Sequence, residues 1–456
     1  MDPRTRELLE APVGRTLLRL AAPNILIMVA QSATGLVETY FVAKLGTDAL
    51  AGMALVFPVL MLVQMISAGA MGGGILSAVA RSLGSNRRAE AGLLAWHAAA
   101  IALALGVATT LAALLGGPAL YRAMGGRDAS LAAALTYSNL VFAGATLIWL
   151  FNSLAAVIRG TGNMIVPARV SAGGAIALLP LSPALIFGIG PLPRLGIAGG
   201  AAAILLYYAA GSAIFAWFLW SGRGVVAPAA RPPRLAWAPT REILRVGAVS
   251  SLVSLSTNIS IATATGFAGT YGPASVAGYG TAVRLEYLLV PLVFGLGAPL
   301  AAMVGTAIGA GRTARALRVT WTGAGIAFAL TEVIGLIGAV FPQAWLGLFG
   351  ADPSLIAVGS QYLRIVGPFY GFFGAGLACY FASQGAGRLA WPLAAATTRV
   401  LIAVAGGYLA LRISGGIAEV FSALGLAILV FGAMNAYAIA SGAWFRGKRA
   451  PRQQPA

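Results

Sequence analysis

Long apolar segments, separated by short polar ones, dominate this chain. The first, residues 20–43, holds a single charged side chain, Glu38. A helix needs about 20 apolar residues to cross the hydrocarbon core of a bilayer. Only 9% of the residues are charged, against roughly 25% in an ordinary soluble domain, so lipid surrounds most of this chain. We predict an all-α membrane protein with twelve transmembrane helices, near residues 17–43, 50–80, 91–116, 130–158, 162–190, 196–221, 243–270, 275–307, 315–341, 355–383, 389–412 and 416–445.

The basic residues predict the orientation of these helices, because Lys and Arg collect in cytoplasmic loops. With the N-terminus inside, 22 of the 30 basic residues fall in inside segments and five in outside segments. Both termini are then cytoplasmic, and topology accounts for much of the formal charge of +18. No short apolar core with a cleavage site precedes residue 17, so we expect no removable signal peptide. The predicted location is the inner (plasma) membrane.

The chain contains an internal repeat. RSLGSNRRAEA (81–91) resembles TAIGAGRTARA (306–316), and RGTGNMIVP (159–167) resembles QGAGRLAWP (384–392), both at an offset of 225 residues. Tyr137 maps onto Tyr362 at the same offset. Six plus six spans that both start inside predict two parallel six-helix lobes related by a pseudo-two-fold axis along the membrane normal. We expect an N-terminal lobe at 1–221, a cytoplasmic linker at 222–242 and a C-terminal lobe with a basic tail at 243–456.

Several kinds of chemistry are missing from the sequence. There is no GxxxxGK[ST] loop for nucleotides, and no His, Cys or carboxylate cluster has metal-ligand spacing. Cys379 is the single cysteine and His97 the single histidine. We therefore expect no cofactor, no bound metal, no enzymatic activity and no nucleic-acid partner. Secondary transport driven by an ion gradient is the function that remains, by a chain with no sign of an obligate protein partner and expected to be monomeric.

Glu38 is the best-supported candidate for ion coupling. Gln31, Thr34 and Glu38 recur at three- and four-residue spacing, so they share one face of a helix. This helix also contains Pro23, which bends it. A polar stripe that ends in a carboxylate is typical of a wall facing a wet cavity, where the carboxyl group could take up a proton outside and release it inside. The other interpretation is an acid at the outer interface near Lys44.

The second half of the chain offers further ionisable candidates. Glu286 and Glu332 lie within predicted spans, where an ionisable side chain is expensive and often functional. Arg284 is two residues from Glu286, a spacing that does not put the two on one helix face. Glu419 begins the last span and is expected at the interface.

These segments resemble the MATE (multidrug and toxic compound extrusion) transporters. The motifs that carry the resemblance are the run from Pro23 to Glu38 followed by FVAKLGTDALAG, then IRGTGNMIVP, LIFGIGPLPRLGIAGGA, VGTAIGAGRTARA and SQGAGRLAWP. The resemblance covers all twelve spans and implies efflux of cationic or amphipathic drugs in exchange for H⁺ or Na⁺. It also implies coupling at Glu38 and a cavity wall that includes Pro23, Gln31, Tyr137 and Asn152.

Two departures from the family pattern bear on the coupling ion. Where similar transporters carry N-x-x-x-D-P in helix 5, this chain has Leu178 and Ser182, and an expected threonine of helix 6 is Gly200. The N-terminal lobe therefore keeps one carboxylate, which favours H⁺ over Na⁺. Ser182 joins the predicted cavity wall, and Ala264 takes the place of Glu38 in the second repeat. Coupling in the second lobe would then need Glu286 or Glu332.

The predicted function is thus multidrug efflux by alternating access, coupled to H⁺ or Na⁺. An alternative is a flippase for lipid-linked sugars, from the same wider superfamily. It would need a cationic cavity, which Arg284, Arg364 and Arg399 could supply if they face inward. A passive channel or a membrane scaffold is a third possibility, although a scaffold needs neither bent helices nor intramembrane glutamates.

Overall fold

The computed structural model describes residues 1–350, 352–413, 415–442 and 444, apart from the side chains of Gln31, Ala33 and Tyr287. These residues form helices and no β-strand. The predicted basic tail, Arg446, Lys448, Arg449 and Arg452, lies outside them. In chain order the elements are α1 (Pro3–Glu10), α2 (Val13–Ala43), α3 (Thr47–Gln64), η1 (Met65–Met71), α4 (Gly72–Gly84), α5 (Arg88–Ala123), α6 (Asp128–Ala143), α7 (Ala145–Gly160), α8 (Ile165–Phe187), α9 (Ile197–Trp220), α10 (Trp237–Gly269), α11 (Pro273–Gly309), α12 (Thr313–Val340), α13 (Pro342–Leu346), α14 (Pro353–Val366), η2 (Gly367–Phe369), α15 (Tyr370–Ala386), α16 (Ala390–Ile413) and α17 (Ile417–Ala440).

The helices match the predicted membrane spans. Among the described residues, 11 helical segments are long and apolar enough to cross a bilayer. The pair α6 and α7, bent by 48°, makes a twelfth if it counts as one span. Two of the spans are composite, with α3, η1 and α4 forming one and α14, η2 and α15 forming another. The all-α membrane fold is therefore confirmed, and multi-pass insertion follows from it.

Prolines and irregular turns lie within several spans. Pro23 lies inside α2 and Pro58 inside α3. Directly after α3, residues Met65–Met71 form a π-helix, a local over-wide turn that often marks a functional site. In the corresponding span of the second half, Pro368 lies in the 3₁₀ turn η2. Each break frees backbone groups and turns the side chains that follow it toward new neighbours.

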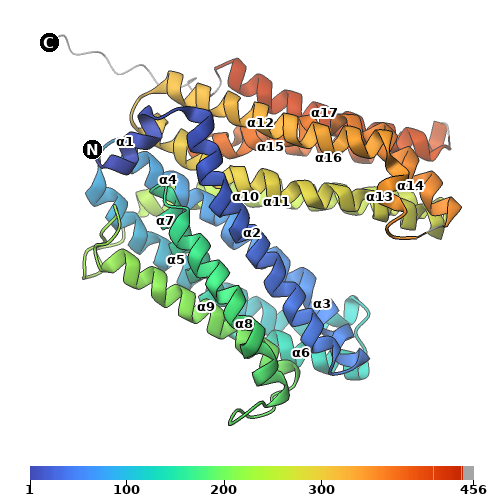
Figure 1. The fold of residues 1–456 in the computed structure, drawn as a ribbon, viewed down its shortest axis with the longest axis horizontal. Coiled ribbons are helices and arrows are strands. Elements are labelled where there is room, and N and C mark those ends of the chain that lie inside the picture. Colours follow the sequence, from blue (N-terminus) through green and yellow to red (C-terminus); the bar gives the residue numbers. More distant parts are fainter. Residues whose placement is uncertain (351, 414, 443, 445–456) are drawn as a thin grey trace. The chain divides into compact units, whose positions relative to one another are not determined.

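The described chain divides into two compact units. The first contains residues 1–254 and 294–319, and the second contains 255–293 and 320 onward. In the first unit, α8 packs against both α2 and α9 (Figure 1). In the second, α17 packs against α14, α15 and α16. The lobes predicted at 1–221 and 243–456 were defined by the order of the spans along the chain, whereas these two units are defined by contacts between residues. The two lobes therefore stay a prediction.

A reciprocal contact inside the first unit reflects the sequence repeat. A Cβ atom added to Gly84 would lie 2.1 Å from the backbone oxygen of Thr306. A Cβ added to Gly309 would lie 2.1 Å from the backbone oxygen of Arg81. At the repeat offset, Gly84 corresponds to Gly309 and Arg81 to Thr306. Pairs that exchange roles in this way are what a two-fold relation between repeated elements requires, and glycine lets the ends of α4 and α11 approach closely.

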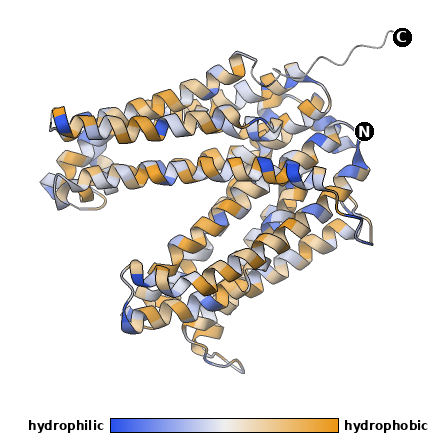
Figure 2. Ribbon diagram, turned by 180° about the vertical axis from the view of Figure 1, so that it is seen from behind, coloured by the Kyte–Doolittle hydropathy of each residue, from blue (hydrophilic) through white to orange (hydrophobic). Residues whose placement is uncertain are grey.

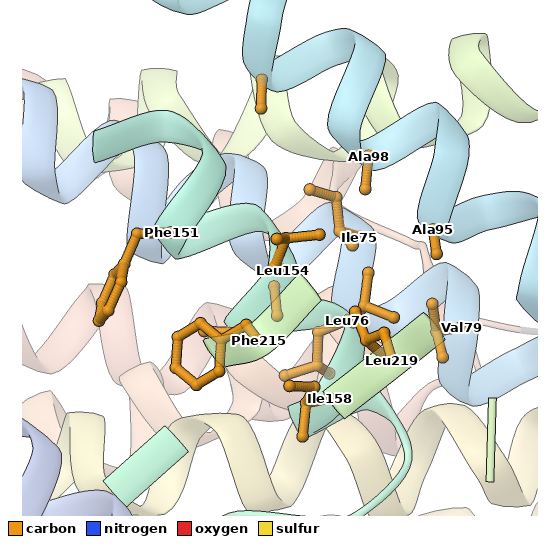
Figure 3. Close-up of a cluster of buried hydrophobic side chains, with 14 of the residues drawn as sticks. Ile75, Leu76, Val79, Ala95, Ala98, Phe151, Leu154, Ile158, Phe215 and Leu219 are labelled. Carbon is orange, nitrogen blue, oxygen red and sulfur yellow. The ribbon is translucent and has the colours of Figure 1, made fainter. Parts of the chain in front are cut away.

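The core of the first unit lies between α4, α5, α7 and α9. Figure 3 shows side chains from these four helices meeting in one cluster, and those it labels are Ile75, Leu76, Val79, Ala95, Ala98, Phe151, Leu154, Ile158, Phe215 and Leu219. Large side chains alternate with alanine, so the helices come close and their shapes interlock. This packing holds α7 and α9 in place, and both helices contribute to the site described below.

The outer helix faces suit a lipid environment. Large apolar side chains are exposed along the spans, among them Leu36, Leu115 and Leu401. Figure 2 shows hydrophobic residues along the lengths of the helices and hydrophilic ones concentrated toward their ends. In water such faces would be a liability. In a bilayer they face hydrocarbon, and the polar ends reach the two interfaces.

Candidate functional site

The predicted coupling residue, Glu38, is buried within the first unit. Its side chain is 2% exposed, although it sits on a span with many exposed apolar residues. The hydroxyl of Tyr137, from α6, donates a hydrogen bond of 2.7 Å to Glu38 Oε1. Oε2 is also buried and has no hydrogen-bond partner among the described residues, which also supply no ion-pair partner for this carboxyl group. A buried carboxylate without a compensating charge is costly, so a proton or another cation would be accommodated readily here.

Gly200 of α9 makes room for this carboxyl group. A Cβ atom added to Gly200 would lie 2.8 Å from Glu38 Oε1, closer than side-chain atoms normally approach. The family resemblance predicted a threonine at this position. The position does lie beside Glu38, but in this chain it provides space where the family pattern has a hydroxyl group.

A second polar group lies where α3 meets the π-helix. Asn152 Nδ2, from α7, donates to Ser67 Oγ at 2.8 Å and to Gln64 Oε1 at 3.1 Å. The hydroxyl of Tyr208, from α9, donates to the same Gln64 oxygen at 3.3 Å. Asn152 was predicted as a cavity residue, whereas Gln64, Ser67 and Tyr208 were missed. Gln64 could have been found, because it is the single amide side chain in the apolar run 50–80.

The other predicted wall residues take separate positions. Thr34 Oγ1 donates to the Ala30 carbonyl of its own helix at 2.9 Å, so its hydroxyl hydrogen bond is local. Ser182 of α8 is 2% exposed, and its hydroxyl has no partner among the described residues. Pro23 lies within α2. The side chain of Gln31 lies outside the part of the chain that the structure describes.

Asn24, next to Pro23, forms a contact that the sequence did not suggest. Its Nδ2 donates to the carbonyl of Gly295 at 2.9 Å and to that of Phe294 at 3.2 Å. Pro299 has no N–H, so it cannot donate the helical hydrogen bond to Gly295, four residues earlier. Asn24 supplies the missing donor. The hydrogen bond connects α2 to α11 within the first unit, next to Pro23.

The second unit contains a similar tyrosine–carboxyl pair. The hydroxyl of Tyr362, from α14, donates to Glu286 Oε1, from α11. Both line a cavity of about 30 Å³, enough for one or two waters. Ala264 and Arg399 also line it. Since Tyr362 is the repeat counterpart of Tyr137, the tyrosine is retained in both halves, whereas the carboxyl group comes from the first helix of one repeat and the second helix of the other.

Arg399 distinguishes the second pair from the first. Its side chain is 8% exposed and lies 5.3 Å from the ring of Phe373 and 5.6 Å from that of Phe431. Cation–π contacts of this kind stabilise a guanidinium group away from water. A positive group, Arg399, and a negative group, Glu286, therefore line one small cavity, and their opposite charges offset each other.

The remaining candidates of the second half do not join this cavity. Arg284 is exposed, with its guanidinium 5.3 Å from the ring of Phe349, and Arg364 is exposed too. Glu332 accepts a 2.7 Å hydrogen bond from the backbone N–H of Gly371, at the beginning of α15. That contact satisfies a helix N-terminus, which is a structural role. Of the three arginines considered for a cationic cavity, Arg399 lines the cavity beside Glu286, and Arg284 and Arg364 do not.

Buried ionisable pairs within bent membrane helices are characteristic of the secondary transporters. Residues 23–184 and 250–409 match the family model MatE, and the chain belongs to this family. It is a membrane transporter and not an enzyme, and the resemblance seen in the sequence is confirmed.

Known relatives extend this result. The chain is 28% identical over 370 residues to a protein of Shewanella oneidensis named "FAD transporter", covering 80% of this chain and 81% of that protein. It is 24% identical over 389 residues to "Probable multidrug resistance protein NorM" of Thermotoga maritima, covering 84% and 82%. Both matches extend across the two repeats.

Among solved structures, a MOP superfamily transporter from Pyrococcus furiosus matches with a TM-score of 0.86 at 25% identity. The match covers 97% of this chain and 99% of that one. The binding pocket of that transporter is described as having a reverse polarity that suggests a different function. The fold is thus shared with that transporter.

Proposed function

We propose that this chain exports cationic or amphipathic compounds in exchange for protons across the inner membrane, by alternating access, with both termini in the cytoplasm. The single observation that carries the proposal is the buried Glu38 carboxyl group, which has one hydrogen bond and one free oxygen among the described residues. A group that changes charge inside a span can link the protonation state to the conformation of the transporter.

The residues around Glu38 support a simple exchange. Tyr137 donates to Oε1 whether or not the carboxyl group is protonated, so it holds the side chain in one orientation. Oε2 is free to receive a proton. When the group is ionised, its negative charge attracts a cationic compound, and protonation removes that attraction. Proton uptake from outside and drug release to the outside are then linked by mass action.

Proton coupling is favoured over sodium coupling because few oxygen atoms of the described residues lie close enough to Glu38 to bind Na⁺. A Na⁺ ion needs several oxygen ligands, as other hard cations do. Among the described residues, Tyr137 alone forms a hydrogen bond with the side chain of Glu38, and it brings one oxygen atom to the carboxyl group. The positions of the missing second carboxyl group and the missing threonine hold Ser182 and Gly200.

A second candidate substrate is an anionic flavin dinucleotide. Two observations favour it: the relative named "FAD transporter" is 28% identical, and Arg399 places a buried positive charge in the second unit. The flippase alternative has less support, because Arg284 and Arg364 are exposed instead of lining a cationic cavity.

The test is proton movement in energised everted vesicles that contain the chain. Adding ethidium should release protons from the acidified interior, in amounts that follow dye uptake and do not depend on Na⁺. Sodium-dependent uptake without proton release would contradict the coupling ion. Proton release on adding FAD but not ethidium would establish the second candidate and overturn the first.

Glu286 should affect substrate affinity more than coupling. In Glu286→Gln the charge of Arg399 is no longer opposed, and it repels a cationic dye. We expect the apparent KM for ethidium to rise about tenfold, equivalent to about 1.4 kcal/mol, with the proton-to-dye ratio unchanged. The measurement is the rate of dye uptake against dye concentration.

The double variant Glu286→Gln/Arg399→Gln supplies the control. It removes both charges, so the KM should return toward that of the wild type if electrostatics is the cause. A KM that stays high in the double variant would show instead that Glu286 contributes through packing or hydrogen bonding.

A further inference from the structure

A basic groove lies in the first unit, formed by other residues than the coupling site. It has a volume of about 510 Å³. Its walls are the end of α1, the turn between α11 and α12, and the first residues of α12. The lining residues are Leu9, Glu10, Gly311, Arg312, Thr313, Ala314, Arg315 and Arg318. Three positive charges and one negative charge therefore face a space large enough for a ligand.

Two of the arginines also fasten α1. Arg315 Nη2 donates to the carbonyl of Leu8 at 3.1 Å and to that of Ala11 at 2.5 Å. Arg312 donates to the Leu9 carbonyl at 3.5 Å and to Glu10 Oε1 at 3.4 Å. These contacts satisfy the last carbonyls of α1, which have no donor within that helix. These contacts leave some N–H donors of the arginines unused. Glu10 offsets one of the three positive charges, through its ion pair with Arg312.

The unused donors define what the groove can bind. Arg315 is 8% exposed, and its Nε has no acceptor among the described residues. Arg318 is exposed and has no hydrogen bond or ion pair within the described part of the chain. A buried donor without a partner is uncommon in proteins. Guanidinium groups around one space bind phosphate through paired hydrogen bonds.

The position of the groove indicates where the phosphate comes from. The groove is lined by the turn that joins the end of α11 to the start of α12. Arg315 also donates to the carbonyl of Ala11, two residues before α2 begins at Val13. The groove therefore lies beside the ends of three apolar spans. Three residues beyond Arg318 on the same helix, Trp321 is exposed. Trp321 is the ninth of the 28 residues of α12, and tryptophan in the first turns of a span is typical of the headgroup level of a bilayer. A ligand here has its charged part at the arginines and apolar helix surface within reach of its chains.

We propose that this groove binds the phosphate of an anionic phospholipid. Basic pockets between transmembrane helices bind such headgroups. The bound phosphate opposes the positive charges that Glu10 leaves uncompensated, and it supports the arginines that hold α1. The site does not depend on the identity of the exported compound.

The test is native mass spectrometry of the purified full-length chain, with equal amounts of phosphatidylglycerol and phosphatidylcholine added. The wild type should retain phosphatidylglycerol preferentially. Arg318→Gln should lower that affinity about fivefold, since one arginine near a membrane surface contributes about that factor. Arg122→Gln is the matched control, because Arg122 is an exposed arginine at the end of another span. It should bind the lipid as the wild type does.

Each other outcome overturns the proposal. Equal retention of the two lipids would show that charge is not recognised. An equal loss of affinity in Arg318→Gln and Arg122→Gln would reduce the effect to net charge. If wild type and Arg318→Gln bind phosphatidylglycerol equally, whereas inorganic phosphate binds the wild type more tightly than the variant, the site belongs to a soluble phosphate ligand.

Discussion

Glu38→Gln is expected to abolish ethidium-triggered proton release from everted vesicles. Glutamine has nearly the same size, and its side-chain oxygen can still accept the hydrogen bond from Tyr137. It cannot carry a proton that it later releases, so the link between protonation and conformation is lost. The measurement compares the size of the pH change after dye addition in vesicles with equal amounts of wild type and variant.

Two further variants make this result specific. Glu419→Gln is the matched control, because Glu419 lies exposed in the first turn of α17, and it should release protons as the wild type does. Tyr137→Phe removes the 2.7 Å hydrogen bond but leaves the carboxyl group, so we expect reduced and not absent proton release. Full proton release in Glu38→Gln would contradict the proposed mechanism and direct attention to Glu286.

Gly84→Ala is expected to destabilise the protein by about 3 kcal/mol, the upper end of the range for overpacked cores. The added Cβ would lie 2.1 Å from the backbone oxygen of Thr306, and a backbone atom cannot move aside as a flexible side chain can. The direction of the change in unfolding free energy is informative, because Gly→Ala within a helix otherwise stabilises the protein by about 1 kcal/mol. Thermal unfolding of the purified protein in detergent measures the change.

Gly309→Ala should behave like Gly84→Ala, since the two glycines make equivalent contacts. Gly116→Ala provides the comparison, because nothing lies within 4 Å of a Cβ at that position of α5. It should leave the unfolding temperature unchanged or raise it slightly. A wild-type unfolding temperature for both Gly84→Ala and Gly309→Ala would show that α4 and α11 do not pack this closely.

The membrane fold could be predicted because the bilayer imposes a simple rule on each span. Its hydrocarbon core demands about 20 apolar residues per helix, and this demand is visible in any single segment without knowledge of its neighbours. The bent pair α6 and α7 was predicted as one span, 130–158, because its apolar run continues through the break at Gly144. The π-helix Met65–Met71 was not foreseen. No proline lies within it, and its Ser67 accepts a hydrogen bond from Asn152 of α7.

The candidate site was predictable in part. Glu38 stood out because an acid within an apolar run is costly to bury and therefore rarely incidental. Its partner Tyr137 is 99 residues away, and only the repeat and the family resemblance pointed to it. Gln64, Ser67 and Tyr208 were missed, since a polar side chain in a span can face a cavity, a neighbouring helix or its own backbone.

The second unit shows most clearly what sequence comparison leaves open. Aligning the repeats placed Ala264 opposite Glu38 and suggested that a carboxyl group was absent there. The structure brings Glu286 from the next helix to the retained tyrosine, and it adds Arg399 to the same cavity. Spacing could not choose between Glu286 and Glu332, because both lie within spans. Their hydrogen bonds separate them, one to a tyrosine in a cavity and the other to a helix N-terminus.

Properties that depend on one segment at a time could be predicted from the order of residues: which stretches are apolar enough to enter lipid, which loops carry positive charge, and which acids are placed where water is scarce. The structure was needed to show which of these groups lie in contact, because packing brings together helices that are far apart in the sequence. Packing between helices places Glu38 beside Tyr137 and Gly200. It also brings Asn24 to the carbonyl group that lacks a donor because of Pro299, and it places Arg399 and Glu286 in one cavity. The solvent acts on each segment separately, whereas packing and charge pairing act between segments.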